Sequence, residues 1–271
     1  MNAAIFRKTA RDGAVLLIAL TLAVVLFEVF FLAAIRQLSG ELQNLLTAQT
    51  FVRYIIRSLV GADLIGDITP TALATVGLAH PVLYAFTWTV LLTAGTRVLC
   101  GEVEQGTADV LLSLPVSRAA IYASVSAWLA VCAASLSAAP LAGLWIAQHI
   151  TPLSAPLEMG RLAQAAANLL LLNLAVASMT LMLSAHASRR SHVIFSALGV
   201  LLGSFLLSFL AQFWSVAQHV AWLGLLHYYR PLPIVQSGEW PVPAMAVLAG
   251  LALVCWVVGL ARFTNRDVQA A

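Results

Sequence analysis

Long stretches without charge separate short polar segments along the chain. Asp, Glu, Lys and Arg are absent from five stretches, 68–96, 119–157, 162–188, 191–229 and 240–261. A sixth stretch, 13–35, contains a single charged residue, Glu28. A helix needs about 20 apolar residues to cross the hydrocarbon core of a bilayer. The pattern predicts six membrane-spanning helices, at 14–36, 79–99, 119–147, 163–186, 192–217 and 242–263.

These stretches are typical of helices rather than β-strands. They are rich in Leu and Ala and do not alternate apolar with polar residues. A helix also satisfies its own backbone hydrogen bonds, which hydrocarbon requires. We therefore expect an all-α, polytopic membrane protein, with residues 1–271 forming a single transmembrane domain.

Composition supports a membrane protein and excludes several other classes. Of the 271 residues 61% are hydrophobic and 9% are charged, against about 25% charged in soluble domains. The mean hydropathy is +0.93. An ordinary soluble enzyme and a disordered chain do not fit this balance. The scattered basic residues form no basic stripe for nucleic acid.

The distribution of basic residues predicts the orientation of the chain. With both termini in the cytoplasm, nine of the 14 Lys and Arg residues lie inside. Three of the other five lie in one long external segment, where the positive-inside rule has little weight. An even number of spans agrees with cytoplasmic N and C termini.

Three segments outside the predicted spans have distinct patterns. Residues 1–12 form a basic, partly apolar start, either an amphipathic segment on the inner membrane surface or a frayed tail. Residues 39–71 have apolar positions at helical spacing, which predicts an amphipathic helix at the outer interface or over a cavity. Residues 218–241 are rich in aromatic residues and Pro, as in an interfacial belt or an external re-entrant hairpin.

The densest charge lies in a predicted cytoplasmic loop, 101–118. Glu102, Glu104 and Asp109 lie there between Arg97 and Arg118. This charge density, next to long uncharged spans, favours a docking surface for a soluble partner.

The same loop has the residues of a short capped helix. Thr107 can cap a helix at 108–114, and Pro115 ends it. Leu111 and Leu112 give this helix an apolar face. Ser117 can cap the third predicted span. A plain tight turn is the alternative, although it would not need eighteen residues.

The loop resembles that of bacterial ABC-transporter permeases of the type-2 exporter family. The residues that match the pattern are Glu102, Gly106, Thr107, Leu111, Leu112, Pro115, Ser117 and Arg118. The six spans, the long first external segment and an ending at Phe263, Arg266 and Asp267 resemble this family as well. The segment 227–231 resembles permeases of the nitrous-oxide-reductase maturation group. Many members have a Lys after the Arg, where this chain has Ala123, Ser124 and Val125.

The resemblance implies a non-catalytic permease subunit in the bacterial inner membrane. Two copies would form the pore, and two copies of a separately encoded ABC ATPase would dock on the coupling helix between spans two and three. ATP and Mg would be bound by that partner. The sequence agrees on one point, because a P-loop needs Gly-Lys-Ser/Thr. The only lysine, Lys8, follows Phe6 and Arg7.

Two other functions differ in the features that they require. A non-transporting module could relay ATP-driven motion to a periplasmic or accessory partner docked on 39–71 or 218–241. A membrane enzyme would need a cluster of buried polar groups, a metal motif or a nucleophile elbow, and the sequence presents none of these.

Glu28 and two glycines are further candidate residues within the spans. A carboxylate at the bilayer centre is costly, so Glu28 should face protein or water. It is either part of a translocation path or dimer interface, or an interhelical hydrogen-bonding group. Gly199 and Gly203 form a G-x-x-x-G, which lets helices approach closely, either at a dimer interface or within one chain.

Overall fold

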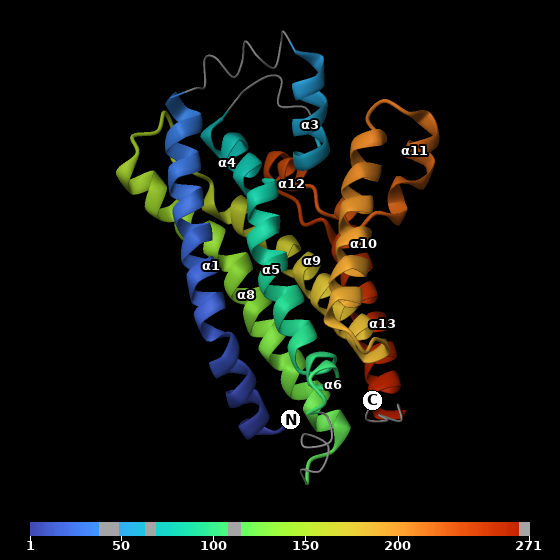
Figure 1. The fold of residues 1–271 in the computed structure, drawn as a ribbon. Helices are drawn as coiled ribbons and strands as arrows, with labels where there is room; N and C mark the ends of the chain where they lie inside the picture. Colours follow the sequence, from blue (N-terminus) through green and yellow to red (C-terminus); the bar gives the residue numbers. More distant parts are fainter. Residues whose placement is uncertain (38–48, 63–68, 108–114, 266–271) are drawn as a thin grey trace.

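The computed structural model describes residues 1–37, 49–62, 69–107 and 115–265, which form helices and no strands (Figure 1). The long helices are α1 (Ala3–Gln37), α5 (Pro81–Arg97), α8 (Arg118–Ile150), α9 (Met159–His186), α10 (Arg190–Leu210) and α13 (Val242–Asn265). The short ones are α3 (Thr50–Val60), α4 (Pro70–Leu78), α6 (Gly101–Glu104), α11 (Ser215–Val220), η1 (Ala221–Leu223), η2 (Leu225–Tyr228) and α12 (Pro231–Ser237). The coupling helix expected at 108–114 lies outside the described residues.

Six stretches of the chain are helical, long and apolar enough to cross a membrane. They are Ala3–Ile35, Pro70–Arg97, Arg118–Ile150, Met159–His186, Arg190–Leu210 and Val242–Asn265. Each corresponds to one predicted span, so the expectation of six such helices in an all-α chain is confirmed. These helices fit a multi-pass membrane protein.

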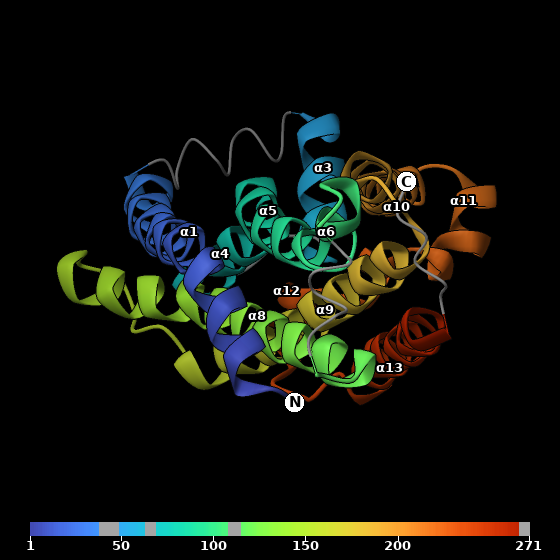
Figure 2. The same ribbon diagram turned by 60° about the horizontal axis from the view of Figure 1, so that its bottom comes forward.

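The helices form a bundle of two uneven layers. α1 packs most extensively against α8, and α9 against α13, while α8 and α9 join these two pairs. α5 contacts α1, α8, α9 and α10. In the tilted view of Figure 2, α1, α5 and α10 lie along one side, with α8, α9 and α13 along the other. α1 begins and α13 ends at one end of the bundle, which we call the terminal end (Figure 1).

The start of the chain differs from the expected surface segment. α1 begins at Ala3 and runs without a break through residue 12. Ile5 and Thr9 are buried, and the backbone N–H of Asn2 donates to Ser124 Oγ of α8 at 2.9 Å. Packing against α8 accounts for the apolar positions of this segment.

The second span is interrupted, which the sequence did not predict. α4 ends at Leu78 and α5 begins at Pro81, whose missing N–H suits the first turn of a helix. His80 caps α5, because its Nδ1 accepts from the backbone N–H of Val82 at 3.2 Å. The prediction started this span at 79 and assigned the first residues of α4 to the external segment.

The segment after α10 is partly buried in the bundle. α10 ends at Leu210, before the predicted 217, and four short helices follow it. Tyr229 is 1% exposed, and its hydroxyl donates to the carbonyl of Leu78 at 3.1 Å. Tyr229 is therefore part of the packed core, whereas Trp214 and Trp222 are exposed. The interfacial belt and the re-entrant hairpin both stay predictions.

Candidate functional site

The described part of the loop after α5 turns tightly at the terminal end of the bundle. Four residues, Gly101–Glu104, form α6. The backbone N–H groups of Gly106 and Thr107 donate to the carbonyls of Val103 and Glu102 at 3.1 and 2.9 Å. Gly106 has φ of 69°, in the left-handed region that glycine adopts without strain. This glycine allows the chain to reverse after one turn of helix.

Glu102 links this turn to the first helix. Its carboxylate lies 3.2 Å from Lys8 Nζ of α1, and it also accepts a hydrogen bond from the Thr107 hydroxyl. Thr107 therefore stabilises the turn through Glu102, while the helix that it was expected to cap lies outside the described residues. The Glu102 side chain is 20% exposed and that of Lys8 is 62% exposed, so the pair itself contributes little stability.

Glu104 links the same turn to the fifth span. Its Oε2 accepts a hydrogen bond from the backbone N–H of Arg190, the first residue of α10, at 2.9 Å. A carboxylate at this position also interacts favourably with the helix dipole. Gly101 is buried beside Arg190, and a Cβ on this glycine would lie 3.3 Å from Arg190 Cδ.

Arg97 joins α5, in the second span, to α1, the first span. Its Nη1 donates to the carbonyl of Asp12 at 2.8 Å, and its Nη2 lies 3.7 Å from Asp12 Oδ2. We call the connected residues the α6 network: Lys8, Asp12, Arg97, Glu102, Glu104 and Arg190. The loop thus contacts α1 and α10, and Arg97 joins α5 directly to α1 beside it.

Some of the other predicted loop residues lie outside the described part of the chain, and the rest lie within it. Asp109, Leu111 and Leu112 lie outside the described residues. Pro115 and Ser117 are exposed, and Arg118 is the first residue of α8. Ser117 caps α8 as predicted, because its Oγ accepts from the backbone N–H of Ala120 at 3.2 Å.

Glu28 lies away from this loop, enclosed within the protomer. It is fully buried, and neither carboxylate oxygen has a hydrogen-bond partner among the described residues. Two glycines make room for it. A Cβ on Gly77 of α4 would contact Glu28 Oε2, and a Cβ on Gly143 of α8 would lie 2.7 Å from Glu28 Cβ. The chain's own helices thus cover Glu28 within the protomer, and its place in a translocation path or dimer interface stays a prediction.

Gly199 and Gly203 face outward from α10. A Cβ on either glycine would meet no described atom within 4 Å. Close packing against another helix of the described chain is therefore not their role. This face of α10 also exposes Phe195, Val200, Leu202 and Leu206.

The comparison with protein families covers most of the bundle. The sequence profile of the family described as "Protein of unknown function (DUF2705)" matches residues 69–269. The chain belongs to the DUF2705 family. The match runs from the start of α4 to beyond α13 and includes the loop after α5, whereas α1 and Glu28 precede it. A search of curated proteins finds no match to this DUF2705 member.

Proposed function

We propose that this DUF2705 protein is the membrane-spanning permease subunit of an ATP-driven ABC transporter of the type-2 exporter class. It works as a homodimer in the bacterial inner membrane with a separately encoded ATPase. The observation that carries the proposal is the loop at 101–118, which resembles the coupling loop of that family. Its described part, 101–107, is tied to α1 and α10.

The α6 network suits the transmission of force from a docked motor. A force applied to this loop would be transmitted to α1 through Glu102 and Lys8, and to α10 through Glu104. The loop also follows α5 and precedes α8 directly. Closure of the ATPase would shift these helices against their neighbours, a shear between two packed arrangements. The nucleotide and its Mg would be held by the partner.

Exposed residues of α1 and α10, which lie on the same side of the bundle, support the proposed homodimer (Figure 2). α1 exposes a stripe of large apolar side chains at Val15, Ile18, Leu22, Leu26 and Phe30. α10 exposes Gly199 and Gly203. Small residues such as these allow two helices to approach closely in a membrane. A second copy could pack on these exposed residues of α1 and α10.

Co-purification from the native membrane tests the proposal. We expect the tagged chain to retain an ABC ATPase with equal numbers of the two subunits, and to stimulate or restrain its hydrolysis. Arg118→Glu combined with Leu112→Asp should abolish this association, because reversed and newly buried charges at an interface are costly. Arg262→Glu, an exposed position in the last turn of α13, is the matched control.

Two results would count against this function. A fully coupled complex that carries Arg118→Glu and Leu112→Asp contradicts docking at 101–118. A complex that hydrolyses ATP but moves no substrate, with a protein partner bound at the other end of the bundle, would favour the motion-relay module instead.

A further inference from the structure

We propose that Glu28 is a proton-binding site, which holds a proton while α1 packs against α4 and α8 and releases it when these helices separate. Glu28 lies 16 residues beyond Asp12 along α1, which places it about 24 Å from that residue of the α6 network at 1.5 Å per residue. The site is therefore separate from the loop at 101–118, and the inference does not depend on the proposed transport function.

Glycines on two neighbouring helices allow the backbone to close around the Glu28 side chain, which is 0% exposed. A Cβ on Gly77 of α4 would contact Glu28 Oε2 and lie 3.1 Å from Phe31 Cδ1. A Cβ on Gly143 of α8 would lie 2.7 Å from Glu28 Cβ and 2.7 Å from the carbonyl oxygen of Val25. The carboxyl group therefore packs directly on α4, while the stem of the side chain packs on α8.

The Glu28 carboxyl group lacks the partners that an ionised carboxylate needs. Neither oxygen makes a hydrogen bond with a described residue. Burial of an ionised carboxylate without a partner costs far more than burial of the neutral acid. Acidic residues inside membrane spans are rare, and proton relays are one of their functions. The enclosed side chain of Glu28 therefore fits the neutral, protonated form.

No basic side chain of the described neighbouring helices is placed to pair with Glu28. α4 has no titratable residue, and α8 has none between 138 and 148, around Gly143. On α5, Arg97 binds Asp12 near the start of α1. Arg36 is eight residues farther along α1, an axial distance of about 12 Å.

The titratable groups near Glu28 are neutral. They are His80, Tyr84 and Tyr229. The His80 ring centroid lies 5.0 Å from that of Phe27 and 5.4 Å from that of Phe31, and its Nδ1 accepts a hydrogen bond, so this nitrogen carries no proton. Burial, and then the proximity of Tyr84 and Glu28, raises the pKa of Tyr229 well above its usual range. The phenol therefore keeps its proton.

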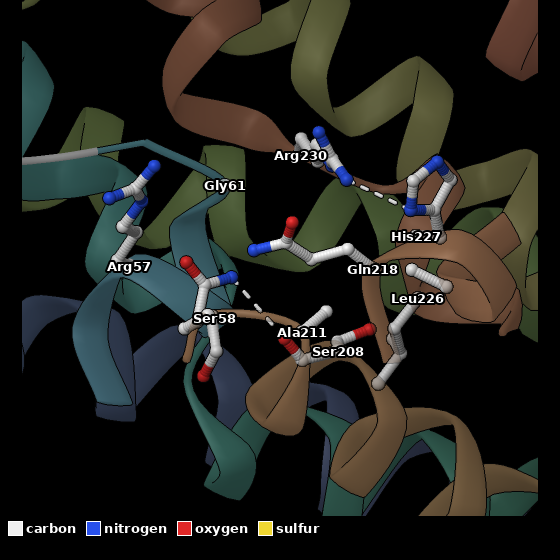
Figure 3. Close-up of a pocket in the computed structure, with 11 residues that line it drawn as sticks. Arg57, Ser58, Gly61, Ser208, Ala211, Gln218, Leu226, His227 and Arg230 are labelled. Atoms are coloured by element: carbon white, nitrogen blue, oxygen red, sulfur yellow. Dashed lines mark hydrogen bonds between the residues drawn. The ribbon is translucent and has the colours of Figure 1, made fainter. Parts of the chain in front are cut away.

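Tyr229 joins the surroundings of Glu28 to the wall of a polar cavity. This cavity of about 300 Å³ is lined by Arg57, Gln218 and Arg230 among others (Figure 3), and Glu28 is not among its described lining residues. Tyr229 directly precedes Arg230, and its hydroxyl donates to the carbonyl of Leu78, the residue after Gly77. Movement of α4 away from Tyr229 would open a route for water from this cavity to Glu28.

Water that reaches the carboxyl group allows the proton to leave. The O–H bond of Glu28 breaks, the electron pair stays on the carboxylate, and the proton passes to water, so no oxidant or reductant is needed. The carboxylate is then stabilised by hydration, which the packed arrangement does not provide. Protonation therefore favours the packed helices and ionisation favours their separation, which links proton binding to a two-state equilibrium.

Infrared spectroscopy of the detergent-solubilised full chain tests for the bound proton. At neutral pH the wild-type chain should show the carbonyl stretch of a protonated carboxyl group, and Glu28→Gln should lose this band. Glu239→Gln replaces an exposed carboxylate and is the matched control, which should keep the band. A wild-type chain without the band at neutral pH would overturn the proposal.

Transfer into deuterated water tests the link to helix packing. The band should shift slowly in the wild-type chain, because exchange requires α1 to separate from α4 and α8. Gly143→Ala loosens this packing and should exchange faster, whereas Gly250→Ala on α13 should exchange as the wild-type chain does. A wild-type shift that is complete within the mixing time would show that water reaches Glu28 in the packed arrangement, and would overturn this link.

The pH dependence of stability provides a second readout. In the unfolded chain Glu28 ionises near pH 4.3. Above this pH the folded chain holds a proton that the unfolded chain has lost, so stability falls as the pH rises. Relative to Glu28→Gln and Glu28→Leu, the ratio of folded to unfolded wild-type chain should fall by up to about tenfold per pH unit. Parallel melting temperatures of all three chains from about pH 5 to about pH 8 would contradict a proton held by Glu28.

Discussion

Glu104 and Arg190 lie 86 residues apart in the sequence, yet the Glu104 carboxylate accepts a hydrogen bond from the Arg190 backbone N–H at 2.9 Å. The first N–H groups of a helix have no acceptor within the helix. Arg189, which precedes α10, makes no capping hydrogen bond with its side chain. Glu104 therefore supplies from another helix the acceptor that a local cap would provide.

Removing this acceptor should weaken the start of α10. We expect Glu104→Ala to lower the free energy of unfolding by about 1 kcal/mol, the usual cost of a lost cap. Glu104→Gln keeps an acceptor oxygen and should lose only part of this. Thermal melts of the purified variants measure the difference. Equal melting temperatures for Glu104→Ala and the wild-type chain would show that the hydrogen bond does not stabilise α10.

The two glycines around Glu28 should not tolerate a methyl group. Gly77→Ala and Gly143→Ala each introduce a Cβ into contact with Glu28 or the α1 backbone. We expect each to cost about 1–3 kcal/mol, as in other overpacked cores. Gly250→Ala in α13, where an added Cβ meets no described atom, is the matched control. In a helix this control should be neutral or stabilising by up to about 1 kcal/mol.

A double-variant cycle can attribute the cost at Gly77 to Glu28. Shortening the side chain with Glu28→Ala should relieve part of the cost of Gly77→Ala, because Oε2 is the atom nearest to the added Cβ. Additive effects of the two substitutions would show that another neighbour resists the methyl group.

Glu28 itself should affect activity more than folding. Glu28→Gln preserves the shape of the side chain and should keep assembly and association with the ATPase. Glu28→Leu replaces a buried carboxyl that has no described partner and should raise the melting temperature. We also expect it to alter ATP hydrolysis or transport, because a change of packing between α1, α4 and α8 would shift the two-state equilibrium. A more stable variant with every activity intact would make Glu28 structural only.

The outward face of α10 should carry the contact between two copies. Gly203→Leu places a large side chain on this face and should reduce the fraction of dimer severalfold in cross-linking and native mass spectrometry. Gly250→Leu makes the same change on α13, where an added Cβ also meets no described atom, and should leave the dimer intact. If both variants dimerise as the wild-type chain does, the interface lies elsewhere.

The sequence predicted the features that depend on one segment at a time. The six long apolar helices follow from uncharged stretches, because transfer of a segment into hydrocarbon depends mainly on the residues in that segment. The cap of α8 by Ser117 is equally local, since the acceptor and the N–H lie three residues apart. The break before Pro81 was missed, although proline and the capping His80 were visible in the sequence.

Only the tertiary structure decided which distant groups meet. Hydropathy places Glu28 in a span but does not reveal that Gly77 and Gly143 enclose it. The polar loop suggested a docking surface, whereas its pairing with Lys8 and Arg190 required the packed bundle. Arg57 and Arg230 likewise line one cavity only because α3 packs against α10 and α12. Such contacts depend on side-chain shape across several helices, which no pattern within a single helix encodes.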